Sequence, residues 1–427
     1  MKRYNAYKDS GVKWIGEIPS HWGCIKIKHL LKERVEKSAD GIGEPLSMSQ
    51  KFGLIPTSQM DIVPNAATSY IGAKHTRRGD MVLNKLKAHL GVFALSSYDG
   101  LVSPDYAVYY GTGRADMEFL EYLFKTPLYV SEFIKKTTGV AIGFNRLYTD
   151  DLFSISAHYP PLHEQQAIVS YLKDKTLKIE QYVSARERER ELLDSLKQSE
   201  IANVVTRGLN PNVKMKDSGI PWIGEIPEHW EPCRNKDIFE ESKKIVGENS
   251  SDYVLLSLTK QGVIVRDLSE NKGKFPKEFN TYKVVEPGDM IFCMFDVDET
   301  PRTVGLSQNH GMITGAYDVF KIKRVLPKFA LYYYLSIDNR KALRPLYKGL
   351  RKVVPLPTFM SSKIFLPPLS EQQAIVAYID EKLQKIDQYM CDLQREIDYL
   401  KEFKQRLISD AVTGQLCVTK TIRRAQQ

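Results

Sequence analysis

Cysteine is scarce in this chain, and the few cysteines are scattered. None lies in a CxxC pair, and none has the spacing of a disulfide framework or a zinc site; they are Cys24, Cys233, Cys293, Cys391 and Cys417. Long hydrophobic runs are also missing, and the first eleven residues are polar where a signal peptide needs an apolar stretch. These absences exclude a disulfide-stapled secreted scaffold and predict a reduced, cytoplasmic protein without a membrane span.

The nucleotide-binding and hydrolase motifs that can be read from sequence are absent. Gly273-Lys274 is followed by Phe275, so no GxxxxGK[ST] loop is available to cradle phosphates. Gly41-Ile42-Gly43 lacks the third glycine of a dinucleotide fingerprint and is expected to be a turn. Neither HExxH nor GxSxG occurs anywhere in the chain. The sequence therefore predicts no ATP motor, no zinc protease and no serine hydrolase.

Metal and methyl-transfer chemistry are equally unsupported. An acidic cluster, Asp296 with Asp298 and Glu299, is expected to be a solvated loop rather than a metal site. Two Pro-Pro pairs follow Tyr159 and Leu366, whereas amino-methyltransferases carry Asn or Asp at that position. The prolines are instead expected to begin helices. We expect no catalytic residue, no metal and no cofactor in this chain.

The chain is large and carries an excess of positive charge. The chain has 427 residues, 42% of them hydrophobic, which is enough for two to four globular domains. Lys and Arg number 61 against 52 Asp and Glu, giving a net charge of +9. A polyanionic partner is the first electrostatic hypothesis.

A long internal repeat organises the chain. The segment from Trp14 to Trp22 recurs from Trp222 to Trp230, 208 residues further on, and the two copies hold all four tryptophans. A second block, residues 160–169, returns 207 residues later at 367–376. Such a repeat predicts two halves built on one plan.

Each half is predicted to contain a small α+β domain. Leu46–Ser49 ahead of Gly53 corresponds to Leu256–Thr259 ahead of Gly262, and each pair is typical of a strand that ends at a glycine turn. Short apolar-aromatic helices are expected around 119–124 and 329–335. The fold class is α+β, with domain boundaries at 1–159, 160–209, 210–366 and 367–427. The second segment is predicted to be a long spacer helix, and the fourth is predicted to be a second spacer helix followed by a C-terminal tail.

The two long segments, 162–207 and 369–413, contain neither glycine nor proline, which predicts helices of roughly 65 Å at 1.5 Å per residue. The second carries a complete heptad seam: Val376, Ile379, Leu383, Ile386, Met390, Leu393, Ile397 and Leu400. In the first, Thr176, Arg186 and Arg190 interrupt the same seam. We predict that the helices pack on each other antiparallel. The alternative, that each folds back on its own domain, would leave most of the stripe exposed.

The duplicated motifs resemble those of the specificity subunits of type I restriction-modification systems. The resemblance rests on DSGxxWIGEIPxHW at 9–22 and 217–230, on PPLxEQQAIV at 160–169 and 367–376, and on the closing segments 202–209 and 409–416. It implies two target-recognition domains that each read half of a split DNA sequence, held apart by paired helices that dock two methyltransferase subunits. Motor-nuclease subunits would complete the restriction enzyme. S-adenosylmethionine, ATP and magnesium would then be bound by the partner subunits.

Because the two variable regions differ in sequence, an asymmetric, bipartite DNA site is expected. A structural adaptor or silent specificity cassette is the alternative, while a self-sufficient restriction-modification enzyme would need methylase motifs that are missing. Basic and amide side chains in polar loops form the pool of candidate DNA contacts. They are Lys74, Arg77, Arg78, Lys85, Lys87, His89, Asn145, Arg146, Lys260, Gln261, Arg266, Lys272, Lys274, Arg302, Arg351 and Lys352.

Overall fold

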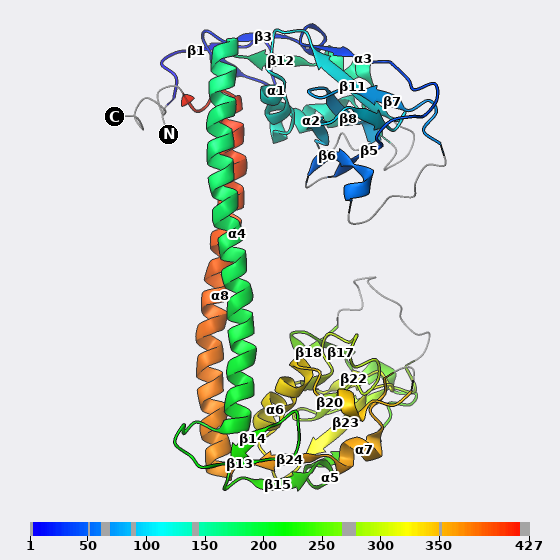
Figure 1. Cartoon of the computed structure of the whole chain (residues 1–427), viewed down its shortest axis with the longest axis vertical. Coiled ribbons are helices and arrows are strands. Elements are labelled where there is room, and N and C mark those ends of the chain that lie inside the picture. Colours follow the sequence, from blue (N-terminus) through cyan, green and yellow to red (C-terminus); the bar gives the residue numbers. More distant parts are fainter. Residues whose placement is uncertain are drawn as a thin grey trace. The chain divides into compact units, whose positions relative to one another are not determined.

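The computed structural model describes residues 3–49, 52–60, 69–86, 91–138, 145–266, 279–349 and 352–418. Contacts within the chain divide it into two units. The first unit is Met1–Arg186 with Arg395–Gln427, and the second unit is Glu187–Gln394. Each unit therefore contains one α+β region together with parts of both long helices, as Figure 1 shows.

The α+β region of the first unit is built on an antiparallel sheet in the order β4-β11-β8-β9, in which Val108 pairs with Val82. Helix α1 begins after Asp116, whose carboxylate accepts hydrogen bonds from the backbone N–H groups of Glu118 and Phe119. The strands are β1 Tyr7–Asp9, β2 Glu17–Pro19, β3 Gly23–Lys26, β4 Leu31–Glu33, β5 Leu46–Ser49, β6 Gly53–Pro56, β7 Lys74–Thr76, β8 Met81–Asn84, β9 Phe93–Leu95, β10 Gly100–Val102, β11 Tyr106–Gly111 and β12 Ser156–Tyr159. The short helices are α1 Met117–Phe124, α2 Pro127–Lys136 and α3 Thr149–Ser154.

The second unit repeats this plan with the sheet order β16-β23-β20-β21, in which Val319 pairs with Ile291. Its strands are β13 Met215–Asp217, β14 Glu225–Pro227, β15 Glu231–Arg234, β16 Phe239–Glu241, β17 Leu256–Thr259, β18 Gly262–Val265, β19 Lys283–Val285, β20 Met290–Phe292, β21 Val304–Leu306, β22 Gly311–Ile313, β23 Asp318–Ile322 and β24 Lys363–Leu366. Its short helices are α5 Asn235–Ile238, α6 Pro327–Asn339 and α7 Leu356–Ser361. The strand-turn-strand and short-helix predictions for both halves are confirmed.

The repeated sequence motifs form a clasp where each long helix begins. In the first unit the buried Glu164 carboxylate accepts a 2.6 Å hydrogen bond from the Tyr4 hydroxyl and lies 2.8 Å from His21 Nε2. In the second unit Glu371 lies 2.8 Å from His229 Nε2 and accepts a hydrogen bond from the Trp230 indole N–H. Each of the two histidines thus joins the start of its α+β region to a long helix.

The long helices are α4 Leu162–Arg207 and α8 Leu369–Val412. Because neither contains glycine or proline, both run unbroken until Gly208 and Gly414, whose φ angles of 74° and 78° suit glycine. A Cβ on Gly414 would also lie 2.5 Å from the ring of Pro19, so the end of α8 packs closely on the first unit's own motif. The predicted extents of both helices are confirmed to within one residue.

The two helices pack antiparallel within each unit. Lys404 pairs with Glu180 at 3.1 Å in the first unit, and Lys197 pairs with Asp387 at 2.7 Å in the second. All eight predicted seam residues of α8 are buried or half-buried. Two of the three interruptions of the α4 seam have polar partners on α8: Arg186 pairs with Glu396 at 3.2 Å, and Arg190 donates to Gln394. Packing of one helix on the other is confirmed, and the alternative in which each folds back on its own domain is wrong.

Candidate nucleic-acid interface

In the first unit, the structure gathers three of the predicted cations beside the end of strand β8. The backbone N–H of Leu147 donates to the carbonyl of Lys85, which places Arg146 next to Lys85. Burial lowers the pKa of Lys85, and the neighbouring charges of Lys74 and Arg146 lower it further, while Glu33 and Asp105 oppose that shift. We call Lys74, Lys85 and Arg146 the first basic cluster. Exposed Asn145 lies next to it in the chain.

The members of this cluster differ in how accessible they are to a ligand. Lys74 is buried and lies 3.4 Å from the Glu33 carboxylate, so it braces strands β7 and β4. Arg146 lies on the surface, 3.3 Å from the exposed Asp105. A surface pair of this kind is worth little and is easily exchanged for a phosphate. Lys85 and Arg146 are therefore better placed than Lys74 to contact an anion.

Arg77 and Arg78 occupy the turn that ends at Gly79. The Arg77 guanidinium pairs with Glu36 at 3.1 Å, and Arg78 Nε donates to the carbonyl of Ser97. Both residues are exposed. Lys87 and His89, which the sequence also predicted, lie outside the described residues.

In the second unit, the exposed turn between β17 and β18 carries Lys260 and Gln261. This turn forms one wall of a groove of about 420 Å³. Lys197 and Gln198 of helix α4 and Arg302 also line this groove. The structure thus brings three predicted residues together and adds two from α4. Sequence reasoning missed those two, because a pair of polar residues on a long polar helix carries no local signal.

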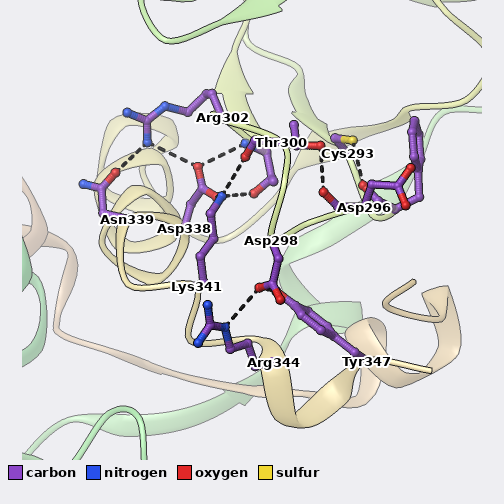
Figure 2. A network of polar contacts seen from close by, with 12 residues as sticks. Cys293, Asp296, Asp298, Thr300, Arg302, Asp338, Asn339, Lys341, Arg344 and Tyr347 are labelled. Carbon is purple, nitrogen blue, oxygen red and sulfur yellow. Dashed lines mark hydrogen bonds and ion pairs between the residues drawn. The ribbon is translucent and has the colours of Figure 1, made fainter. Parts of the chain in front are cut away.

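A network of polar contacts fixes the loop between β20 and β21, as Figure 2 shows. The Asp338 carboxylate is buried and binds Arg302 at 3.2 Å, the Thr303 hydroxyl at 2.6 Å and Lys341 at 2.7 Å. Arg302 also donates to the side-chain oxygen of Asn339. The Arg302 side chain is 18% exposed, so this arginine holds the loop more than it faces solvent.

The acidic cluster at 296–299 is part of the same loop. Asp298 accepts a hydrogen bond from Arg344 at 3.0 Å and pairs with Lys352 at 3.3 Å. Partial desolvation raises the pKa of Asp298, but the hydrogen bonds from Arg344 and Lys352 outweigh it and lower that pKa overall. Asp298 therefore makes two ion pairs at the surface, and its neighbour Glu299 is 78% exposed. In the described part of the chain, no three potential ligands are grouped as a metal site.

The remaining predicted residues of the second unit are scattered. Arg266 is half-buried just after β18, while Lys352 is 45% exposed and has a positive φ of 45°. Lys272, Lys274 and Arg351 lie outside the described residues. The Lys260 turn and the loop fixed by Asp338 are therefore the described parts of this unit that present a candidate surface.

No family model matches this chain, but two curated proteins are similar to it in sequence. A Methanocaldococcus jannaschii protein assigned as the specificity subunit of type I restriction enzyme MjaX is 23% identical, over 96% of this chain and 98% of its own length. The type I restriction enzyme MjaVIII specificity subunit of the same organism is 24% identical over 70% of each chain.

Solved structures show the same fold. One, from work on complex assembly and conformational transition of the type I R-M system, has a TM-score of 0.66 and 15% identity, covering 93% of this chain and 99% of its own. The HsdS subunit from Thermoanaerobacter tengcongensis has a TM-score of 0.51 and 17% identity, covering 93% and 98%. The resemblance found in the sequence motifs is confirmed. Among the described residues, no helix has the length and apolarity to span a membrane.

Proposed function

We propose that the chain is a type I restriction specificity subunit and that it reads the DNA sequence on behalf of such a system. The observation that carries this proposal is the duplication: two α+β regions of one plan, joined by two antiparallel helices, with relatives that match along nearly the whole length. The chain itself is non-catalytic. Its partners are double-stranded DNA and the other subunits of the system.

Each α+β region reads one half of a bipartite site. The target-recognition domains span 1–159 and 210–366. The first spacer helix lies within 160–209, and 367–427 holds the second spacer helix and the C-terminal tail. A symmetric dimer carries two identical surfaces and reads two related half-sites. A chain that carries two different surfaces reads two different half-sites. The DNA site is therefore asymmetric.

The contacts with DNA come from the accessible members of the predicted pool. In the first domain, Lys85, Arg146 and Asn145 are supported by their grouping, and Arg77 and Arg78 by their exposure. In the second domain, Lys260 and Gln261 are supported by their exposed turn and the adjoining groove. Cations at such positions meet phosphates, while amide and guanidinium groups also reach base edges. Lys74 pairs with Glu33, and Arg302 pairs with Asp338. These two cations position the loops and do not contact DNA themselves.

Partner subunits supply the chemistry. Two methyltransferase subunits dock on the helices and bring S-adenosylmethionine, and motor-nuclease subunits bring ATP and magnesium for restriction. The seam from Val376 to Leu400 holds the two helices together and so keeps the docking surface in shape. Charge substitutions at Leu383 and Ile386 would open the seam and abolish assembly.

Base-resolved adenine methylation of the host genome, with and without this gene, tests the proposal. Loss of methylation at one bipartite, asymmetric motif is the expected result. Unchanged methylation would contradict it and favour a silent cassette or an adaptor. Binding of the purified chain to the methyltransferase subunit would then distinguish those two alternatives.

A further inference from the structure

The two units carry different side chains at one corresponding place, beside the ends of strands β8 and β20. In the first unit the carbonyl of Lys85 accepts a hydrogen bond from the N–H of the residue after Arg146, and in the second the carbonyl of Met294 accepts one from the residue after Val353. Met294 and Val353 are therefore the counterparts of Lys85 and Arg146, and both are apolar. Lys352 directly precedes Val353 and brings a cation to the edge of this place.

In the second unit, cations at this place gather on a carboxylate. Arg344 Nε donates to one oxygen of Asp298 at 3.0 Å, and the Tyr347 hydroxyl donates to the same oxygen at 3.3 Å. Lys352 Nζ lies 3.3 Å from the other oxygen. Figure 2 shows the side chains of Arg344 and Tyr347 meeting at Asp298. We call Arg344, Tyr347 and Lys352 the Asp298 cradle.

The Asp298 cradle holds the kinds of donor that bind a phosphate group. A guanidinium, an ammonium and a hydroxyl are among the side-chain groups that contact DNA phosphates. Burial, and after it the charge of Asp298, raises the pKa of Tyr347 to about 12, so its hydroxyl keeps the proton that it donates at neutral pH. The three donors therefore meet at Asp298 as they would at a phosphate.

The cradle is accessible from solvent. The Arg344 and Lys352 side chains are 66% and 45% exposed, while the Asp298 side chain is 20% exposed. Ion pairs at such exposure are weak, so a phosphate can take the place of the carboxylate. Lys352 also has a positive φ of 45°, which lysine rarely adopts, so its loop holds this cation in place at a local cost.

We propose that Asp298 is an internal substitute for a DNA phosphate, which fills the cradle in the free chain and is displaced when the backbone of the second half-site binds. This inference rests on the proposed function. The first unit supports it, because Lys85 and Arg146 occupy the corresponding place there without such a carboxylate between them and are proposed DNA contacts.

Competition of this kind acts on every DNA sequence alike. Phosphate contacts carry no sequence information, so a carboxylate that opposes them lowers the affinity of the second domain for any duplex. Discrimination between sequences is then left to the contacts with base edges. Asp298 would thus limit non-specific binding by a chain with an excess of positive charge.

A carboxylate that only fixes the loop would behave in the opposite way. Its loss would loosen Arg344 and Lys352 and weaken the binding of DNA, whereas the loss of a competitor strengthens that binding. The sign of the change in affinity therefore distinguishes the two roles of Asp298.

Equilibrium binding of two duplexes by the chain, assembled with its methyltransferase subunits, tests the proposal. One duplex carries the motif found by methylation mapping, and the other has the same composition in scrambled order. Asp298→Asn should bind both duplexes about three- to tenfold more tightly. Glu299→Gln is the matched control, because Glu299 is the neighbouring carboxylate, 78% exposed and 3.9 Å from Lys352. It should change the affinity less than about twofold.

Replacing the cations of the cradle completes the test. Arg344→Ala with Lys352→Ala should weaken binding of both duplexes and lower the dependence of log K on log salt by about 1, since one phosphate contact is lost. Asp298→Asn added to this pair should have no further effect, because no cation is left for which Asp298 competes. The gain expected for Asp298→Asn alone cannot arise from lost folding.

Three results would overturn the inference and leave the proposed function standing. They are unchanged or weaker binding by Asp298→Asn, an equal gain in Glu299→Gln, and a gain that persists without the two cations. An unaltered complex that binds the motif duplex no more tightly than the scrambled one would contradict the proposed function itself.

Discussion

At the same turn, the two α+β regions carry residues of opposite charge. In the first unit Arg77 pairs with Glu36 at 3.1 Å, and in the second unit Glu286 lies 3.8 Å from Lys244 at the corresponding positions. The backbone is the same in both, because Asp80 and Asp289 each accept a hydrogen bond from the residue three positions earlier. The scaffold is thus retained while the positions of cation and anion in this ion pair are exchanged, which suits the proposal that the two domains read different sequences.

Scaffold residues common to both units should give the largest effects when they are changed. Trp22 and Trp230 are the corresponding buried tryptophans, 0% and 1% exposed. Trp230→Ala should cost about 3–5 kcal/mol of stability, because it leaves a large cavity in the second unit's core. Hydrogen exchange measured separately in each unit should show lost protection in the second unit. Equal loss in both units would contradict the independence of the two cores.

A buried histidine distinguishes the first unit from the second. His158 lies between the Tyr129 hydroxyl at 3.1 Å and the Val412 carbonyl at 3.0 Å, and Phe365 occupies the corresponding position in the second unit. Burial lowers the pKa of His158 to about 4, while the Val412 carbonyl opposes that shift. The folded state therefore resists a proton that the unfolded state accepts, so stability is full above pH of about 6.5 and falls as the pH drops toward 4.

The loss should approach about 3 kcal/mol, since one pKa unit corresponds to about 1.4 kcal/mol. Hydrogen exchange between pH 7 and 4 should show the first unit weakening more than the second. His158→Phe, which copies the second unit, should reduce this difference. A difference that persists unchanged in that variant would show that His158 is not its source.

The two clasps differ in burial, and their loss should therefore differ in cost. The Glu164 side chain is 4% exposed and the Glu371 side chain is 25% exposed. Glu164→Ala leaves the Tyr4 hydroxyl and His21 without their acceptor and should destabilise the first unit by about 1–3 kcal/mol. Glu371→Ala should cost less in the second unit. Chemical denaturation of the two variants measures this order, and a reversed order would contradict the assignment of the first clasp as the stronger.

Single cations at the proposed DNA surfaces should give the smallest effects. Lys260→Ala should weaken DNA binding by the methyltransferase complex about three- to tenfold and lower the dependence of log K on log salt by about 1. Lys85→Ala should act similarly through the other half-site. Lys404→Ala, whose lysine pairs with Glu180 on the helices, is the matched control. An unchanged salt dependence in Lys260→Ala would remove that lysine from the interface.

The scaffold could be predicted because its signals are repeated and periodic. The absence of glycine and proline from α4 and α8 and the heptad seam predicted both helices and their packing. The surfaces were harder to predict, because charge alone does not distinguish Lys74, which is buried against Glu33, from exposed Lys260. Nor does sequence reveal that Lys197 of α4 shares a groove with that turn, since more than sixty residues separate them.

The most direct test of the central claim is the methylated motif of a chain whose residues 1–159 are replaced by the corresponding region of a related specificity subunit with another target. The account predicts that base-resolved methylation changes in one half of the bipartite motif, while the other half keeps its sequence. A motif that stays unchanged, or one whose two halves both change, would contradict the claim that each domain reads one half-site.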